Sequence, residues 1–195
     1  MTKRILIIQG HPDPRPERLC RALAASYAEA AVAAGHEVRT IDVAAIDFPL
    51  LASQEEWQNG VPPPAIAAAQ QDIAWAEHIV IIHPLWLGAM PALLKGFLEQ
   101  AMRPGFAITW EGGAKGWGRL LGGRSARIVV TMGMPAFVYR WFFRAHSLKS
   151  LERNILKFVG IKPVRETLVG MVGALDDRKA ARLLDKMRAL GRKGA

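Results

Sequence analysis

Ile79-Val80-Ile81-Ile82 is an uninterrupted apolar run, and Pro84 brings it to an end. Continuous β-branched runs of this kind are typical of strands that are buried on both faces of a parallel sheet. Two more runs of the same kind and two weaker strand patterns complete the set: Ile5–Ile8, Ile128–Thr131, Glu37–Val43 and Val164–Met171. The sequence therefore predicts five strands.

Helical patterns separate these strands. The predicted helices are Glu17–Ala34, Ala65–Glu77, Pro91–Met102, most of Pro135–Gly160, and Asp176–Leu190. The stretch 47–60 has an irregular pattern, and 112–123 is a glycine-rich loop. Because strands alternate with helices, we expect an α/β fold. Its expected form is a three-layer sandwich, with a five-stranded parallel sheet in the order 2-1-3-4-5 and helices on both faces.

Length and composition suit a single domain over residues 1–195. The chain is 51% hydrophobic and 22% charged, which is enough apolar material for a substantial core. Its formal net charge is +9. Cys20 is the only cysteine, so we expect neither an internal disulfide framework nor a metal site rich in cysteine. The low cysteine content and the lack of an apolar stretch near the roughly 20 residues of a membrane span lead us to expect a cytoplasmic protein.

In open parallel sheets, ligands bind beyond the carboxyl ends of the strands, where the strand order reverses. The first loop at that edge follows Ile8 and ends on a helix N-terminus, whose free N–H groups favour an anion. Its side chains include donors suited to phosphate, namely His11, Arg15 and Arg18. The alternative is an ordinary turn, stiffened by prolines, with solvated arginines.

The second loop follows Ile82 and combines a rigid backbone with apolar cover. Pro84 and Pro91 brace a stretch that contains Trp86 and Met90. That combination suits a flat aromatic ring system. An isolated tryptophan is more often a core residue, and this alternative stays open.

The third loop follows Val130, and Gly133 lets a ligand approach its backbone closely. Tyr139 and His146 come next in the chain. Beside a redox ring, a tyrosine hydroxyl and an imidazole can hydrogen-bond to and protonate a reduced carbonyl oxygen. The alternative is a half-buried tyrosine and a surface histidine.

Together, the three loops resemble those of the flavodoxin-like NAD(P)H:quinone oxidoreductases, and the match covers most of the chain. Its strongest part begins at Pro84-Leu85 and continues through Met90-Pro91-Ala92, Leu94-Lys95-Gly96 and Gly105-Phe106-Ala107. Gly10-His11-Pro12 and the Thr131-x-Gly133 turn agree with the family in order and position.

The resemblance implies a non-covalently bound flavin, FAD or FMN. Its phosphate would lie near His11, Arg18, Leu19 and Cys20. Its ring would lie against Pro84, Leu85, Trp86, Leu87 and Gly88 on one side, and against Thr131, Met132, Gly133 and Met134 on the other. Tyr139 and His146 would be the catalytic pair.

The activity that the resemblance implies is hydride transfer from NAD(P)H, through the flavin, to a quinone or similar acceptor, by a homodimer. Azo- or nitro-compound reduction would use the same site. Two alternatives to this reductase activity stay open. The chain could be an ancillary regulatory subunit of a potassium efflux system, or it could be a flavodoxin-type electron carrier. Such carriers are typically acidic, and a net charge of +9 counts against this last function.

Positive charge is concentrated in residues 140–165, which hold seven Lys or Arg residues and one Glu. Such a run is usually a solvated helix face, but it also suits the 2′-phosphate of NADPH, an acidic partner or anionic lipid. Trp141-Phe142-Phe143 lies within it, and there we favour a dimer interface over membrane contact, which would be peripheral at most. We expect no nucleic-acid binding, because no recognised motif accompanies the charge.

Overall fold

The computed structural model describes residues 2–110 and 116–195, and its centre is a five-stranded parallel sheet. The strands are β1 (Arg4–Gln9), β2 (Glu37–Asp42), β3 (His78–Pro84), β6 (Ser125–Thr131) and β7 (Val164–Val169). Their order is β2-β1-β3-β6-β7, and every neighbouring pair is parallel. The predicted order 2-1-3-4-5 is confirmed.

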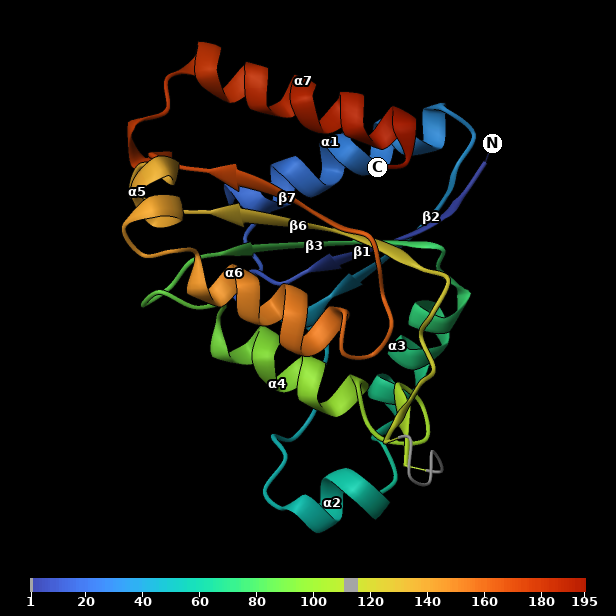
Figure 1. The fold of residues 1–195 in the computed structure, drawn as a ribbon. Coiled ribbons are helices and arrows are strands. Elements are labelled where there is room, and N and C mark those ends of the chain that lie inside the picture. The colour runs from blue at the N-terminus through green and yellow to red at the C-terminus, as the bar shows by residue number, and fades with distance from the viewer. Residues whose placement is uncertain (1, 111–115) are drawn as a thin grey trace.

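Helices cover both faces of the sheet, as Figure 1 shows. One face carries α1 (Leu19–Ala33) and α7 (Asp177–Lys193). The other face carries α3 (Pro64–Trp75), α4 (Ala92–Ala101), α6 (His146–Ser150) and the π-helical stretch η3 (Leu151–Leu156) that continues α6. Among the described residues, no helix has the length and apolar character needed to cross a bilayer.

Alternate residues of β1 divide between two cores. Ile5 and Ile7 pack toward α1 and α7, whereas Leu6 and Ile8 pack toward α4. All four side chains are fully buried. Because β1, β3 and β6 pair in parallel, their carboxyl ends meet at one edge of the sheet.

The stretch 47–60, expected to be irregular, contains a short helix, α2 (Gln54–Asn59). Ser53 caps it by accepting a hydrogen bond from the Glu56 N–H at 3.1 Å. The buried Arg103 guanidinium donates to the carbonyl oxygens of Glu56 at 2.8 Å and Gly60 at 2.9 Å. The prediction was wrong here because this helix depends on a residue far along the chain.

The described part of the glycine-rich stretch, residues 116–123, contains a short strand where a loop was predicted. Residues 112–115 lie outside the described residues, and β5 (Gly118–Arg119) then pairs antiparallel with β4 (Ile108–Thr109). The remaining short elements are η1 (Val43–Ala45), α5 (Ala136–Trp141) and η4 (Val172–Ala174).

The stretch 135–160 is mostly helical, as predicted, but a sharp corner separates α5 from α6. Arg144 and Ala145 form the corner with φ angles of 53° and 50°, in the left-handed region. This conformation costs roughly 1–2 kcal/mol for each non-glycine residue. Surrounding contacts fix it, among them the bond from the Ala145 N–H to the Tyr139 carbonyl at 3.0 Å.

Candidate functional site

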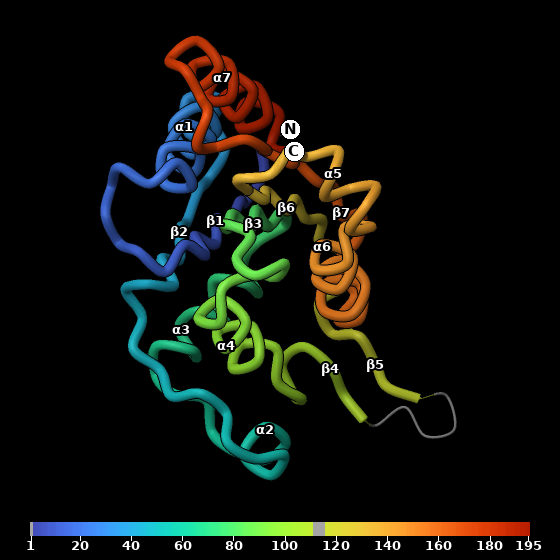
Figure 2. The backbone as a smooth tube through the Cα atoms, turned by 90° about the vertical axis from the view of Figure 1, so that its left-hand side faces the viewer, coloured from blue at the N-terminus to red at the C-terminus, as the bar shows by residue number. Residues whose placement is uncertain are grey.

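The loops after β1, β3 and β6 converge at the carboxyl edge of the sheet, which faces the viewer in Figure 2. They enclose a cleft of about 370 Å³. Its lining consists of His11, Arg18, Leu19, Cys20, Pro84, Leu85, Trp86, Thr131, Met132, Gly133 and Val172. Ten of these eleven residues belong to the thirteen that the resemblance assigned to the cofactor.

Asp13 organises the first loop. Its carboxylate accepts hydrogen bonds from the Arg15 side chain at 2.7 Å and from Arg18 Nε at 2.7 Å. The Arg15 backbone N–H also donates to this carboxylate, and this bond is the main reason why the pKa of Asp13 lies below its ordinary value. Asp13 therefore remains an anion that fixes the Arg18 guanidinium at the cleft.

His11 is held in one orientation by its own loop. Its backbone N–H donates to Gln9 Oε1 at 3.1 Å, and its ring Nδ1 accepts from the Asp13 N–H at 3.0 Å. Partial burial lowers the pKa of His11 below its ordinary value. The neutral ring thus carries its proton on Nε2, which is a donor available to a ligand.

The start of α1 adds further donors to the same wall. Arg18 is the N-cap residue, and its side chain makes no cap hydrogen bond. The first N–H groups of a helix have no partner within the helix, so Leu19 and Cys20 present theirs at the cleft. Together with Arg18, this helix start suits a phosphate group.

The second loop is braced by backbone bonds. The Leu85 N–H donates to the Thr131 carbonyl at 2.7 Å, and Trp86 and Ala89 exchange two bonds of 2.9 Å. Leu87 and Gly88 form the turn between them with positive φ angles. Both are exposed and lie outside the lining of the cleft.

Trp86 and Gly133 shape the space inside the cleft. Trp86 is half-exposed and meets the His11 ring edge-on, with 5.8 Å between centroids. A Cβ added to Gly133 would meet no atom within 4 Å. The cleft therefore combines an aromatic wall and open space with the cation of Arg18, and this combination fits a flat ring system with a phosphate tail.

Cys20 and Thr131 join the first and third walls beneath this space. Their Sγ and Oγ1 atoms lie 3.3 Å apart. Burial raises the pKa of the Cys20 thiol to about 11, so the group is protonated at neutral pH. It packs as a neutral thiol and does not serve as a nucleophile.

A sequence profile of the family described as having a flavodoxin-like fold matches residues 3–190. The chain belongs to this family. Its cleft lies at the strand-order reversal between β1 and β3, where doubly wound folds bind their ligands.

Known proteins resemble the chain over nearly its whole length. An uncharacterized NAD(P)H oxidoreductase of Haemophilus influenzae is 29% identical over 184 residues, which cover 92% of this chain and 90% of its own. The structure of the NAD(P)H:quinone oxidoreductase from Methanothermobacter marburgensis is 24% identical with a TM-score of 0.81 and covers 100% of both chains. An FMN-dependent NADH-azoreductase from Bacillus anthracis str. Ames Ancestor, solved in complex with FMN, is 18% identical with a TM-score of 0.80 and also covers 100% of both chains.

The structure does not bring Tyr139 and His146 into the lining of the cleft. Tyr139 is 2% exposed, and its hydroxyl accepts a hydrogen bond from the Leu148 N–H at 3.1 Å. Burial raises its pKa above the ordinary value for tyrosine. His146 is exposed at the first position of α6. Met134 is partly buried against the core and also lies outside the lining.

Two residues of this site were not predicted from the sequence. Val172 lines the cleft from the turn after β7, whose carboxyl end was not among the loops considered. Asp13 lies within the first loop but carries no phosphate-binding signal, because a carboxylate repels an anion. Its closeness in the sequence to Arg15 and Arg18 is the only local signal that it could pair with them and hold them in place.

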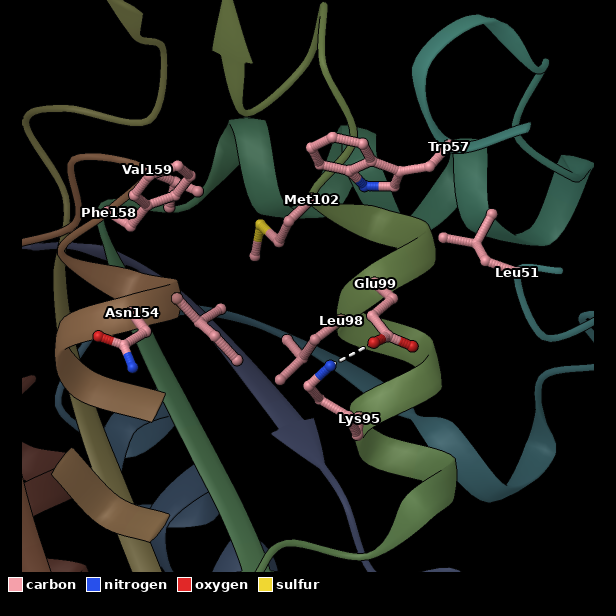
Figure 3. A pocket seen from close by; sticks show the side chains of 10 residues that line it. Leu51, Trp57, Lys95, Leu98, Glu99, Met102, Asn154, Phe158 and Val159 are labelled. Atoms are coloured by element: carbon pink, nitrogen blue, oxygen red, sulfur yellow. Dashed lines mark hydrogen bonds and ion pairs between the residues drawn. The ribbon is translucent and has the colours of Figure 1, made fainter. Parts of the chain in front are cut away.

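A second cavity of about 450 Å³ lies between α4 and η3, away from all the sequence-predicted site residues. Its lining is mostly apolar: Leu51, Trp57, Lys95, Leu98, Glu99, Met102, Asn154, Ile155, Phe158 and Val159. Figure 3 shows Lys95 paired with Glu99 along α4, and Met102 on the side of the cavity toward Phe158. Three distant segments build this cavity, so no local pattern in the sequence predicts it.

Proposed function

We propose that the chain is a flavoprotein reductase that takes a hydride from NAD(P)H and passes it to a quinone or a similar acceptor. The observation that carries this proposal is the single cleft that unites ten of the residues assigned to a flavin. The NAD(P)H oxidoreductase of H. influenzae and the FMN-bound azoreductase support it as relatives with related chemistry.

The residues of the cleft have separate tasks in this proposal. Arg18, His11 Nε2 and the start of α1 offset the charge of the flavin phosphate. Trp86 and the open space at Gly133 receive the ring. When bound, the flavin supplies the two-electron carrier chemistry, while the protein supplies position and electrostatics. Trp86 is half-exposed, so the cleft has an open side at which a nicotinamide and then an acceptor can stack in turn.

The cofactor itself is the first test. We expect purified protein to be yellow, and chromatography after denaturation to identify the released flavin as FMN or FAD. Mixing with NADPH or NADH alone in a stopped-flow instrument should bleach the flavin, which separates a reductase from an electron carrier that is reduced by a protein partner. A preparation that takes up neither flavin after reconstitution would overturn the proposal and favour an ancillary subunit.

We also propose that Tyr139 and His146 serve the acceptor oxygen. His146→Ala is expected to lower the rate of quinone reduction by about 100-fold, as loss of a proton donor does, without changing stability. Tyr139→Phe should lower the rate and also cost about 1–2 kcal/mol of stability, because it leaves the Leu148 N–H without its partner. Steady-state kinetics and thermal melts measure both. Unchanged quinone-reduction rates in both flavin-loaded variants would refute the assignment.

Assembly and location are part of the same proposal. We propose a homodimer, on the strength of the resemblance, and sedimentation velocity tests it. We propose the cytoplasm as the place of action, where NAD(P)H is supplied and the single cysteine stays reduced.

A further inference from the structure

Four aromatic side chains project from one corner of the molecule. Phe137, Trp141 and Phe142 are 67%, 77% and 79% exposed, and Phe143 is 46% exposed. Four basic residues surround them. Together these eight residues form what we call the basic aromatic patch: Phe137, Trp141, Phe142, Phe143, Arg140, Arg144, Lys149 and Arg153.

The patch carries positive charge that the protein itself leaves unpaired. It borders a hollow of about 580 Å³, whose two acidic residues are already engaged: Glu166 pairs with Arg140, and Glu152 pairs with Lys157. In the part of the chain that the structure describes, the side chains of Arg144, Lys149 and Arg153 make no hydrogen bond or ion pair. An anionic partner would therefore meet three available cations.

The corner between α5 and α6 holds the aromatic side chains outward. Tyr139 is buried on the inner side of α5 and accepts the Leu148 N–H of α6. The left-handed residues Arg144 and Ala145 complete the turn between the two helices. Because these contacts fix α5 in place, Trp141 and Phe142 are presented in a defined geometry and lose little conformational freedom when they bind.

We propose that the basic aromatic patch docks on the surface of an anionic phospholipid bilayer. Trp141 and Phe142 would enter the interfacial layer, where aromatic side chains partition favourably. Arg144, Lys149 and Arg153 would lie over the phosphate groups, where each basic residue contributes attraction. Charge complementarity thus identifies the partner as an anionic surface.

The same charges argue against a second copy of this chain, the partner expected from the sequence. A two-fold interface centred on the patch would place it against its own copy, and these cations would then repel each other. A nucleotide also fits less well, because one base would stack on one ring and leave the other aromatic side chains exposed. A bilayer surface engages all of them at once.

If the proposed function holds, docking at this corner also has a consequence for the acceptor. Figures 1 and 2 show α5 beyond the carboxyl ends of the strands, at the same end of the molecule as the loops of the cleft. A docked molecule would hold its cleft near the bilayer. The acceptor class would then be apolar quinones dissolved in lipid.

The test is flotation of the full chain with vesicles of phosphatidylcholine alone or of phosphatidylcholine with phosphatidylglycerol. We expect binding to the anionic vesicles only, weakened by raising the salt concentration. Lys149→Glu with Arg153→Glu should reduce binding by at least about 30-fold, since two attractive charges are lost. Trp141→Ala with Phe142→Ala should reduce it as well.

A matched control uses the exposed positions 182 and 186 of α7, on the opposite face of the sheet. Arg182→Glu with Lys186→Glu makes the same change in net charge, again on one Lys and one Arg four residues apart, and should leave binding within about twofold, because a Debye length of about 8 Å screens charges remote from the contact. An equal loss of vesicle binding in the two charge-reversal variants, the one in the patch and the one in α7, would overturn the proposal. Equal binding to neutral and anionic vesicles would overturn it as well, and so would no binding to either.

Two more outcomes would identify a different partner for the patch, and each would overturn the proposal of bilayer docking. Lys149→Glu with Arg153→Glu would raise the KM for NADPH without changing flotation if the patch bound the nucleotide. Trp141→Ala with Phe142→Ala would break a dimer in sedimentation if the patch bound a second copy.

Flotation needs neither flavin nor turnover, so failure of the proposed function leaves this test intact. In flavin-loaded enzyme, the charge variant should slow reduction of a long-chain quinone in anionic vesicles and spare a water-soluble quinone.

Discussion

The Gly133→Val variant is expected to bind flavin about 100-fold more weakly than the unaltered chain, because overfilling a packed contact costs roughly 1–3 kcal/mol. Gly133 lines the cleft, and its missing side chain leaves open space on the side where we place the ring. An added Cβ has no protein atom within 4 Å, so the new side chain would occupy the space that we assign to the ring. The loss should therefore appear in a fluorescence-quenching titration with FMN or FAD, and not in the melting temperature of the apoprotein.

Gly122→Val is the matched control for this variant. Gly122 also has no atom within 4 Å of an added Cβ, and it lies in the turn before β6, outside the lining of the cleft. This variant should titrate with flavin as the unaltered chain does. If Gly133→Val kept its flavin affinity, the ring would not lie over Gly133 and our account of the cleft would be wrong.

Gly191→Ala is expected to lower the melting temperature by about 5–10 °C, which corresponds to a loss of about 2–3 kcal/mol. Gly191 lies in α7, where it packs against α1. A Cβ added there would lie 2.2 Å from the Tyr27 carbonyl oxygen and 3.2 Å from the Ala31 nitrogen. Both atoms belong to the backbone of α1, so the two helices must separate to admit a methyl group.

The sign of the change in melting temperature of Gly191→Ala distinguishes helix propensity from helix packing. In an open helix, glycine to alanine is favourable by about 1 kcal/mol. A loss at position 191 would thus demonstrate that helix contact outweighs helix propensity there. Gly122→Ala, with open space around its new methyl group, should melt within about 1 °C of the unaltered protein, in line with ordinary surface substitutions. An increase in the melting temperature of Gly191→Ala would contradict the close packing of α1 and α7.

The strands were predictable because their signal is local. Ile5–Ile8, Ile79–Ile82 and Ile128–Thr131 are apolar without interruption, and each is buried in the structure. The cleft was predictable for a related reason, since parallel strands deliver the loops that follow them to one edge. The resemblance then named the residues, and ten of them line one cleft.

The remaining features depend on contacts between distant residues. α2 is a short polar helix, and Arg103 holds it in place by donating to the Glu56 carbonyl. No pattern within residues 47–60 predicts that contact. The corner at Arg144 and Ala145 adopts a conformation that neither residue type favours. The Tyr139 hydroxyl joins α5 to α6 by accepting the Leu148 N–H, a contact that only tertiary packing creates.

Cys20 is the chain's only thiol, it is 1% exposed, and burial raises its pKa to about 11. Maleimides and iodoacetamides react with exposed thiolates, so they will leave the folded protein unmodified. A cysteine introduced at any surface position is then the sole reactive point on the molecule. Spin labels and fluorophores can be attached there one at a time, with the natural sulfur left in place and no background to subtract.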